Sequence, residues 1–413
     1  MPAKLLFYAH NGWGLGHLSR MVKIATLLQA EIHDLSILFL TQSSLVHVLR
    51  LPPGTDVVKL PEVLQKGQFA APKRLPLPFE AVTQLRQRIM RATALAYQPH
   101  LLLVDHAPLG VRQELLPTLR ALKEAPSKPV IVCGLLDLTG PSYVREHWQA
   151  VNAVPILEEL YDEIWVYGCQ ALYDPIKEYE LPDTVARKVR FCGYLGVKPP
   201  TRPPEAIRQE LGVGRGKLVL VTVGGLGWDG FPVLDTYLEA LECLPKDLEL
   251  HSILFTGPEL PLEQREILDR RRRQIASRFP WTRSVQLLEF SPRLLDFMAA
   301  SDLIVARGGY NTVTEILSLG RRALIVPRIA PNLEQLTRAS LFEERGLIRM
   351  LHPDHLSPRS LAEALLAALD GPPPSRQRLL EVGLEMNGLD EVKAHVLRLL
   401  RYQVKIPSSR YEG

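Results

Sequence analysis

The chain has 413 residues, enough for two or three domains of ordinary size. Hydrophobic residues make up 46% of it and charged residues 23%, which excludes an intrinsically disordered, fibrous or disulfide-stapled protein. The 49 lysines and arginines against 45 aspartates and glutamates leave a net charge of +4, too small to indicate a nucleic-acid partner.

The cysteines are far apart and include no C-x-x-C pair, which argues against a zinc site and favours reduced thiols in the cytosol. The N-terminal residues lack the long apolar segment of a signal peptide. No apolar stretch reaches the ~20 residues needed to cross a bilayer. We therefore expect a cytoplasmic protein, and peripheral attachment to the inner face of the cell membrane stays open.

Short apolar runs alternate with amphipathic segments in the first half, which predicts a doubly wound α/β domain with a parallel sheet. The expected strands are Lys4–Ala9, Ser36–Leu40, Asp56–Leu60, Leu101–Asp105, Val130–Gly134 and Glu163–Tyr167. The expected helices are Leu18–Ala30, Phe79–Ala96 and Tyr143–Leu160. The proline-rich stretch Pro61–Pro78 is expected to form a long loop over the sheet.

A second series of strands and helices follows the stretch Lys198–Pro204, whose four prolines predict a stiff hinge. Its expected strands are Leu218–Val223, Ser252–Phe255, Val285–Glu289, Leu303–Ala306 and Ala323–Val326. A last helical stretch is expected at Gln377–Arg401. Two Rossmann-like α/β domains that face a central cleft are therefore predicted.

Glycine-rich turns follow three of the expected strands, where open α/β sheets bind ligands. The first turn contains Gly14 and Gly16 and leads into a helix that starts near His17. Its pattern breaks the G-x-G-x-x-G fingerprint because Ser19 holds the last position, which disfavours a nicotinamide or flavin enzyme. His17 either faces the ligand or simply bonds to the loop at the helix start.

The second turn, with Gly224, Gly225 and Gly227, follows a buried strand and leads into a helix. Successive backbone N–H groups in such a turn can bind an anion. The turn lacks the G-K-[ST] ending of a nucleotide-hydrolysing P-loop. A phosphate contact is favoured, and a plain tight turn is the alternative.

The third turn is the most specific of the three. A diphosphate can rest on the amides of Gly309–Thr312, including Asn311, with Arg307 supplying positive charge. Glu315 can accept hydrogen bonds from both hydroxyls of a ribose. Alternatively, Thr312 and Glu315 form a T-x-x-E capping box. Further along, Glu334 and Gln335 open another helix and can bind sugar hydroxyls or merely favour the helix N-terminus.

The stretch Arg307–Gly346 resembles the donor-sugar motif of GT-B glycosyltransferases, and most closely that of glycosyltransferase family 28. The type enzyme of that family is the N-acetylglucosaminyltransferase of peptidoglycan-precursor synthesis. The two earlier glycine turns resemble the other loops of the family. Further segments suggest a bacterial branch of predicted glycosyltransferases. The resemblance covers nearly the whole chain.

The resemblance implies roles for particular residues. Glu315 would bind the ribose of the nucleotide, and the backbone at Phe290 and Ser291 would hold uracil. Glu334 and Gln335 would read the transferred sugar. The diphosphate would rest on six residues, which are Gly224, Gly225, Gly227, Gly308, Gly309 and Thr312. The donor would be a UDP-sugar that acts as co-substrate, with UDP-N-acetylglucosamine the best guess, and no cofactor is expected.

Two departures from the family pattern concern the donor site. Arg307 stands where related plant and antibiotic enzymes carry a histidine, and Glu334 replaces one amide of a Gln-Gln pair. The second departure bears on which sugar is transferred.

The sequence contains no Asp-x-Asp, the pattern of glycosyltransferases that hold their diphosphate through a metal. We therefore expect a metal-independent, inverting transfer that needs one general base. His17 is the candidate base, because histidine is the side chain that most often serves as a general base at neutral pH. Asp105 ends a neighbouring strand and either orients the imidazole or is an ordinary strand-end carboxylate.

The domain roles that follow are an acceptor domain over residues 1–197, a hinge over 198–204 and a donor domain over 205–374. Residues 375–413 would form a helix that packs back towards the first domain. The acceptor can be a small molecule, a glycan or a lipid-linked sugar. Arg86, Arg88 and Arg91 make one predicted helix basic and amphipathic, which is compatible with anionic lipid.

Three other functions remain open. A nucleotide-sugar epimerase or hydrolase of the same fold would turn over the donor without an acceptor. A non-catalytic nucleotide-sugar binding protein would tolerate the loss of His17. A nicotinamide oxidoreductase is disfavoured by the broken glycine fingerprint.

Overall fold

The computed structural model describes residues 2–10, 15–66, 69–140, 144, 148–224, 227–280, 282–330 and 332–404. The chain divides into two compact units. Unit 1 comprises Met1–Leu195 and Asn387–Gly413, and unit 2 comprises Gly196–Met386. The chain passes from unit 1 to unit 2 between residues 195 and 196 and returns to unit 1 between residues 386 and 387. The sequence predicted domain boundaries at 197/198 and 374/375.

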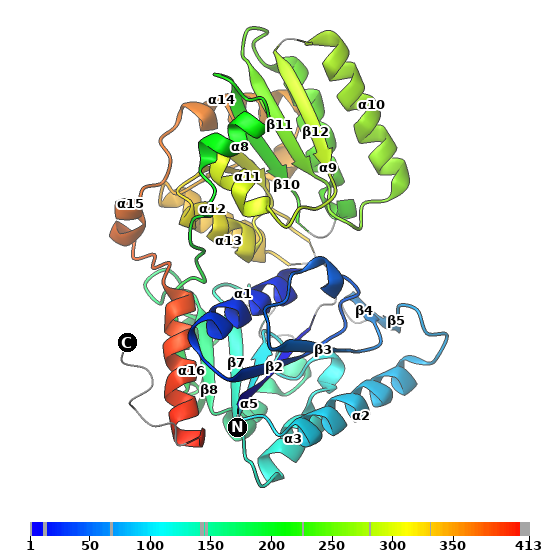
Figure 1. Cartoon of the computed structure of the whole chain (residues 1–413), viewed down its shortest axis with the longest axis vertical. Coiled ribbons are helices and arrows are strands. Elements are labelled where there is room, and N and C mark those ends of the chain that lie inside the picture. Colours follow the sequence, from blue (N-terminus) through cyan, green and yellow to red (C-terminus); the bar gives the residue numbers. More distant parts are fainter. Residues whose placement is uncertain are drawn as a thin grey trace. The chain divides into compact units, whose positions relative to one another are not determined.

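Unit 1 is built on a parallel sheet in the order β3-β2-β1-β6-β7-β8-β9 (Figure 1). The strands are β1 (Ala3–Ala9), β2 (Leu35–Thr41), β3 (Thr55–Lys59), β6 (Leu101–Asp105), β7 (Val130–Leu136), β8 (Glu163–Tyr167) and β9 (Val189–Phe191). All residues of β6 and β8 are buried. Strands covered on both faces need continuous apolar runs, which is why these strands were recognisable in the sequence.

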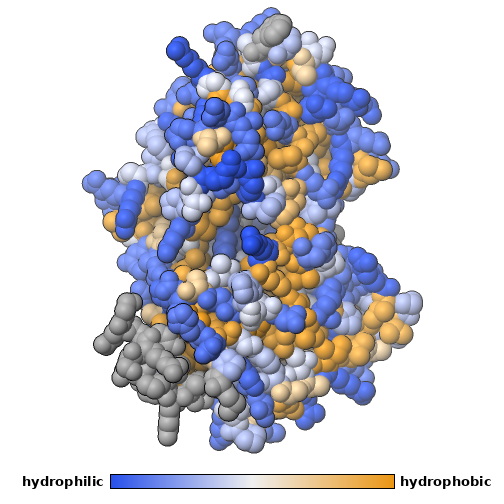
Figure 2. Space-filling view, in the orientation of Figure 1, coloured by the Kyte–Doolittle hydropathy of each residue, from blue (hydrophilic) through white to orange (hydrophobic). Residues whose placement is uncertain are grey.

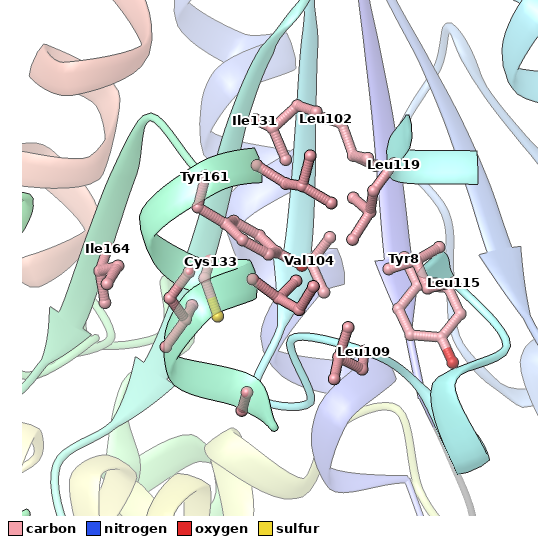
Figure 3. Packing of buried hydrophobic residues seen from close by; sticks show 14 of the residues in the cluster. Tyr8, Leu102, Val104, Leu109, Leu115, Leu119, Ile131, Cys133, Tyr161 and Ile164 are labelled. Carbon is pink, nitrogen blue, oxygen red and sulfur yellow. The ribbon is translucent and has the colours of Figure 1, made fainter. Parts of the chain in front are cut away.

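The helices of unit 1 flank this sheet. They are α1 (Gly16–Glu31), α2 (Phe79–Tyr97), α3 (Leu116–Glu124), α5 (Ala153–Leu160), α6 (Pro175–Glu178), α7 (Asp183–Ala186) and α16 (Gly388–Val404). α1 buries Leu18, Met21, Ala25 and Leu28, a three-to-four-residue spacing that places them on one face. Figure 3 shows the core on the other side, where the Tyr161 ring packs among apolar side chains from β6 and β7.

Unit 2 carries its own parallel sheet, in the order β12-β11-β10-β13-β14-β15. The strands are β10 (Lys217–Thr222), β11 (Leu250–Phe255), β12 (Arg283–Leu288), β13 (Leu303–Ala306), β14 (Arg322–Ile325) and β15 (Arg349–Met350). The helices are α8 (Pro204–Glu210), α9 (Gly227–Ala240), α10 (Leu262–Arg278), α11 (Leu294–Ala300), α12 (Tyr310–Ser318), α13 (Glu334–Glu344), α14 (Pro358–Asp370) and α15 (Arg376–Glu381). Each unit is therefore a separate doubly wound α/β domain.

Three predicted elements differ from the structure. Of the helix expected at Tyr143–Leu160, α5 forms only from Ala153, because Asn152 before it has the left-handed φ of +50°, and Tyr143 lies outside the described residues. The expected loop Pro61–Pro78 contains an antiparallel hairpin of β4 (Val63–Lys66) and β5 (Phe69–Pro72). The expected last helix is two helices, of which α15 belongs to unit 2 and α16 to unit 1. Gly388, the first residue of α16, lies against the backbone of Tyr194, so close that a Cβ would stand 2.7 Å from the Tyr194 carbonyl oxygen.

Arg86 on α2 is not part of an exposed basic face, as its spacing suggested, because its side chain is 1% exposed. Its guanidinium bonds to the Glu114 carboxylate, to Gln42 Oε1 at 2.8 Å and to the carbonyl of Pro61. The Tyr8 hydroxyl donates to Glu114 Oε1 at 2.7 Å. The Gln42 amide also pairs with the backbone of Val63, where β4 begins. This buried network of hydrogen bonds connects the β4–β5 hairpin and α2 to β1 and to the residues that follow β2.

Candidate functional site

The first group of predicted site residues lies at the carboxyl ends of β1 and β6 in unit 1. β1 pairs with β2 on one side and with β6 on the other, where Ala9 stands opposite Asp105. The strand order reverses here, the usual ligand position in open α/β sheets. α1 begins at Gly16 and brings His17 to this edge. Gly14 lies outside the described residues.

The structure brings His17 and Asp105 together. His17 Nδ1 lies 2.6 Å from Asp105 Oδ2. Arg20 binds the same carboxylate, with Nε donating to Oδ1 at 2.9 Å and Nη2 to Oδ2 at 2.6 Å. Arg20 Nη2 also lies 3.0 Å from His17 Nδ1, but it donates to Asp105 Oδ2 at the shorter distance of 2.6 Å. Because an ionised carboxylate only accepts hydrogen bonds, we assign the proton of the short His17–Asp105 contact to His17 Nδ1. The lone pair of the neutral ring is therefore on Nε2, as a general base requires.

The charge of Asp105 is secured by its surroundings. Burial raises the pKa of its carboxyl, but the Arg20 charge and the hydrogen bonds from His17 and Arg20 outweigh burial and hold that pKa well below its usual range. Burial and the neighbouring His17 lower the pKa of His10 to about 3, so His10 is neutral. His17 stacks on His106 with ring centroids 5.6 Å apart and is itself 23% exposed. His17 thus combines solvent access with a fixed carboxylate partner.

Sequence reasoning missed Arg20, which is 2% exposed. Its position three residues after His17, on the same helix face, was the available signal. The two hydrogen bonds from buried Arg20 hold the Asp105 carboxylate in place, and Asp105 in turn orients the His17 ring.

The second group lies at the carboxyl ends of β10 and β13 in unit 2. β10 pairs with β11 on one side and with β13 on the other, where Thr222 stands opposite Ala306. Gly224 follows β10 with φ +78°, a backbone conformation that residues with a Cβ rarely adopt. Gly227 is the first residue of α9. Gly225 lies outside the described residues.

The capping-box interpretation of the third glycine turn is wrong. The N-cap of α12 is Gly309, a residue without a side chain to cap the helix, so Thr312 is not the N-cap that a capping box requires. Thr312 lies inside the first turn, together with Asn311, and Glu315 lies one turn further, only 9% exposed. First-turn N–H groups have no acceptor within their own helix, and a helix N-terminus attracts anions. The turn therefore has the form of an anion site.

Glu334 and Gln335, at the start of α13, lie beside this turn. A Cβ at position 308 would stand 2.8 Å from the backbone oxygen of Gln335, so Gly308 permits the close approach of α13. Arg338 donates to the Gly308 carbonyl at 2.9 Å and to Glu334 Oε1 at 3.0 Å. Gln335 Oε1 accepts a bond from the backbone N–H of Arg328 at 3.1 Å. Arg338, which the sequence did not suggest, neutralises Glu334.

Arg307 follows β13 directly, and its side chain is 13% exposed. Its Nη1 donates to the backbone oxygen of Asp229 in α9 at 2.6 Å, and Nη2 lies 3.5 Å from the Asp229 carboxylate. Burial lowers the pKa of Arg307, while the Asp229 charge opposes this shift. Arg307 therefore connects the edge of β13 to the first turn of α9.

Phe290 and Ser291 follow β12, which β11 and β10 separate from β13. The Phe290 ring is 38% exposed. Ser291 Oγ accepts a bond from the Arg293 N–H at 3.1 Å, and its carbonyl accepts one from Leu294. The two residues share the sheet edge of the glycine turns, and within the described ranges no hydrogen bond or ion pair joins them to those turns.

The described part of the chain holds no group of three or more His, Cys, Asp or Glu side chains suited to a metal ion. Nor does any described helix combine the length and the apolar character needed to span a bilayer.

Residues 218–379 match the model of the glycosyltransferase family 28 C-terminal domain. Unit 2 thus resembles the C-terminal domain of family 28 over this range. The matched range contains the second and third glycine turns, α12 and the start of α13. The resemblance to family 28 is confirmed over this part of the chain.

Two curated relatives match parts of the chain. An uncharacterized glycosyltransferase of Methanopyrus kandleri is 25% identical over 198 residues, which are 46% of this chain and 50% of the relative. A UDP-N-acetylglucosamine–N-acetylmuramyl-(pentapeptide) pyrophosphoryl-undecaprenol N-acetylglucosamine transferase of Streptococcus pyogenes is 39% identical over 70 residues, 16% of this chain and 19% of the relative. The chain thus matches half of the first relative and about a fifth of the second.

Solved structures resemble the whole chain. MurG of Acinetobacter baumannii has a TM-score of 0.58 at 15% identity, covering 97% of this chain and 100% of that one. A putative UDP-N-acetylglucosamine 2-epimerase of Listeria monocytogenes has a TM-score of 0.59 at 14% identity, covering 98% and 97%. These likenesses and the two parallel sheets confirm the predicted GT-B fold.

Proposed function

We propose that the chain is a glycosyltransferase that takes its sugar from a nucleotide sugar bound by unit 2. The observation that carries the proposal is the turn Gly308–Glu315. It lies at the carboxyl end of β13, begins a helix whose N-cap is the glycine Gly309 and falls within the family 28 match. Backbone amides there suit a diphosphate, and the Glu315 carboxylate suits ribose hydroxyls.

The donor we propose is a UDP-sugar, with UDP-N-acetylglucosamine as the first choice. The Streptococcus pyogenes relative is named for transfer of N-acetylglucosamine from UDP-N-acetylglucosamine, and its match is at 39% identity. Glu334 and Gln335 would bind hydroxyls of the sugar. Because Arg338 holds Glu334 Oε1, the other carboxylate oxygen would be the acceptor for a hydroxyl.

The mechanism we propose is an inverting, metal-independent displacement. Nε2 of His17 would remove the proton from the acceptor hydroxyl, and Asp105 would stabilise the imidazolium that forms. Arg20 would keep Asp105 ionised and in place. Arg307 and the N-terminal amides of α12 would stabilise the charge of the departing diphosphate.

UDP is expected to raise the midpoint of thermal unfolding by several degrees at saturation, whereas NAD is expected to leave it unchanged. Glu315→Ala should weaken UDP binding about 10-fold, because a hydrogen bond to a charged group is lost. Wild type should bind the 2′-deoxy analogue of UDP more weakly than UDP. Glu315→Ala should bind the analogue and UDP with equal affinity. Calorimetric titration measures these four affinities.

Glu363→Ala is the matched control, since Glu363 is 67% exposed on α14 of the same unit. A protein that responds to NAD and not to UDP would overturn the proposed donor class.

A nucleotide-sugar epimerase or hydrolase is the second candidate. The fold likeness to a putative UDP-N-acetylglucosamine 2-epimerase favours it. Such an enzyme needs no acceptor, so rapid turnover of UDP-N-acetylglucosamine alone would support this candidate against transfer. NMR spectroscopy of the sugar product distinguishes an epimerase from a hydrolase. An epimerase changes the configuration at C2 and leaves the nucleotide attached, whereas a hydrolase releases the sugar from the nucleotide.

We further propose that unit 1 binds the acceptor and touches an anionic membrane surface through α2 and the segment before it. Leu75, Leu77, Leu85 and Leu95 are 40%, 47%, 40% and 37% exposed. Arg88 and Arg91 are exposed on the same helix. Figure 2 shows hydrophobic side chains gathered over β4 and β5, next to this segment. Apolar side chains with flanking arginines suit a peripheral contact with anionic lipid.

The protein is expected to float with vesicles that contain phosphatidylglycerol and not with vesicles of phosphatidylcholine alone. The double variant Leu77→Asp/Leu85→Asp should lose most of this binding, because charges enter the apolar contact. Leu262→Asp in unit 2 is the control, since Leu262 is 70% exposed. Equal flotation of the double variant and wild type would contradict this surface.

A further inference from the structure

A second arginine, Arg328, lies at the sheet edge next to Arg307. It follows β14, the neighbour of β13 on the side away from β10. Its Nη1 is 3.8 Å from Asp229 Oδ2, the same carboxylate oxygen that lies 3.5 Å from Arg307 Nη2. Two guanidinium groups from adjacent strands thus converge on one side chain in the first turn of α9.

Arg328 has far more hydrogen-bond donors than acceptors around it. Its side chain is only 22% exposed, and its guanidinium donates no hydrogen bond to any part of the chain that the structure describes. The Nε atoms of Arg307 and Arg328 are both buried without an acceptor among those residues. Buried donors without acceptors are costly, and a distance of 3.8 Å is too long for a hydrogen bond.

The charges around Asp229 are unequal as well. Arg307 and Arg328 carry one positive charge each, and Asp229 compensates one of them. The next arginine along, Arg338, already has Glu334 as its partner. Among the described residues, Asp229 is thus the one carboxylate within 4 Å of the two guanidinium groups at the carboxyl edge of β13 and β14.

We propose that Arg328 is a second diphosphate ligand, which forms with Arg307 a two-arginine site whose net charge is set by Asp229. This inference rests on the proposed function, since the diphosphate is that of the nucleotide sugar. Adjacent strands lie about 4.8 Å apart, so side chains at their ends can each take one of two linked phosphates. Arg307 lies beside the amides of α12, and Arg328 serves the neighbouring phosphate.

The site specifies a class of donor. A nucleoside diphosphate sugar carries one negative charge on each of its two phosphates, which matches two guanidinium groups. A nucleoside monophosphate sugar has a single phosphate and leaves one arginine without an acceptor. Since planar guanidinium binds phosphate through paired N–H groups, lysine at position 328 would supply the charge without the same geometry.

The test compares the affinities of UDP, uridine and inorganic pyrophosphate by calorimetric titration. Arg328→Gln should bind UDP and pyrophosphate about 10-fold more weakly, the effect of losing charge-assisted hydrogen bonds, and should bind uridine as wild type does. The affinity of Arg328→Lys for UDP and pyrophosphate should lie between those of wild type and Arg328→Gln. Arg359→Gln is the control, since Arg359 is 89% exposed on the same unit.

A second variant removes the opposing charge. Asp229→Asn keeps the backbone oxygen that accepts from Arg307 but leaves both arginines uncompensated. It should bind UDP and pyrophosphate several-fold more tightly than wild type and leave uridine binding unchanged. This variant gains affinity, so a folding defect cannot imitate the expected result.

The outcomes separate this inference from the proposed function. UDP binding by wild type that is unaffected in Arg328→Gln overturns the role of Arg328 alone. Equal losses for uridine and UDP also overturn it, because they place Arg328 at the nucleoside. Binding of pyrophosphate that depends on Arg328, without any binding of UDP, supports the two-arginine site and contradicts the proposed donor. No binding of either ligand by wild type overturns both.

Discussion

His17→Ala is expected to lower sugar transfer by about 100-fold or more while UDP affinity stays within about two-fold of wild type. Nε2 of His17 is the proposed acceptor of the hydroxyl proton, and its ring is fixed by Asp105 in unit 1. The donor contacts proposed for UDP all come from unit 2. Slow hydrolysis of the UDP-sugar, in which water takes the place of the acceptor, provides a measurement of UDP release for every variant.

Two variants serve as references for this prediction. His47→Ala changes an exposed histidine of unit 1 and should keep full activity. Asp105→Asn should lose nearly as much activity as His17→Ala, because an amide can donate to Nδ1 and favour the tautomer without a lone pair on Nε2. Near-normal turnover by His17→Ala would contradict the role of His17 as general base.

Arg86→Met is expected to destabilise unit 1 by about 3–5 kcal/mol, the cost of leaving the buried Glu114 carboxylate without its partner. Glu114 is 1% exposed and would keep only the Tyr8 hydroxyl and a backbone N–H as donors. For a unit of this size the loss corresponds to a fall of about 10 °C in the unfolding midpoint. Differential scanning calorimetry measures it.

Two further variants isolate the cause. Arg88→Met is the control, on the same helix but exposed to solvent. Arg86→Met/Glu114→Gln removes both charges and should recover part of the lost stability. Hydrogen exchange in Arg86→Met should rise first in β4 and α2, which the network fastens to the sheet. An unchanged midpoint in Arg86→Met would show that the pair adds nothing to stability.

Most strands were predictable because both faces of a central parallel strand are buried. Their apolar runs are therefore continuous and local, as in Leu101–Asp105. The hairpin of β4 and β5 was not predictable, because its prolines indicate a loop. Its position depends on Gln42 and Arg86, which are distant in sequence.

The glycine turns of the candidate site were predictable from the sequence, whereas its buried arginines were not. Glycines after buried strands located both sheet edges correctly. Arg20 and Arg328 were missed because arginine is usually exposed, and nothing local marks one that is buried. Arg20 meets Asp105 from 85 residues away, a contact that only the assembled sheet creates.

The placement of α16 has a consequence for synthesis. Trp165 stacks on His395, and Glu163 binds Arg398, so the last described helix completes the first unit. Unit 2 is one continuous segment, Gly196–Met386, which leaves the ribosome before α16 does. The half of the molecule that is translated first is thus the half that is finished last. Until α16 is translated, the Trp165 ring and the Glu163 carboxylate on β8 lack the side chains that pack against them and bind them in the finished unit.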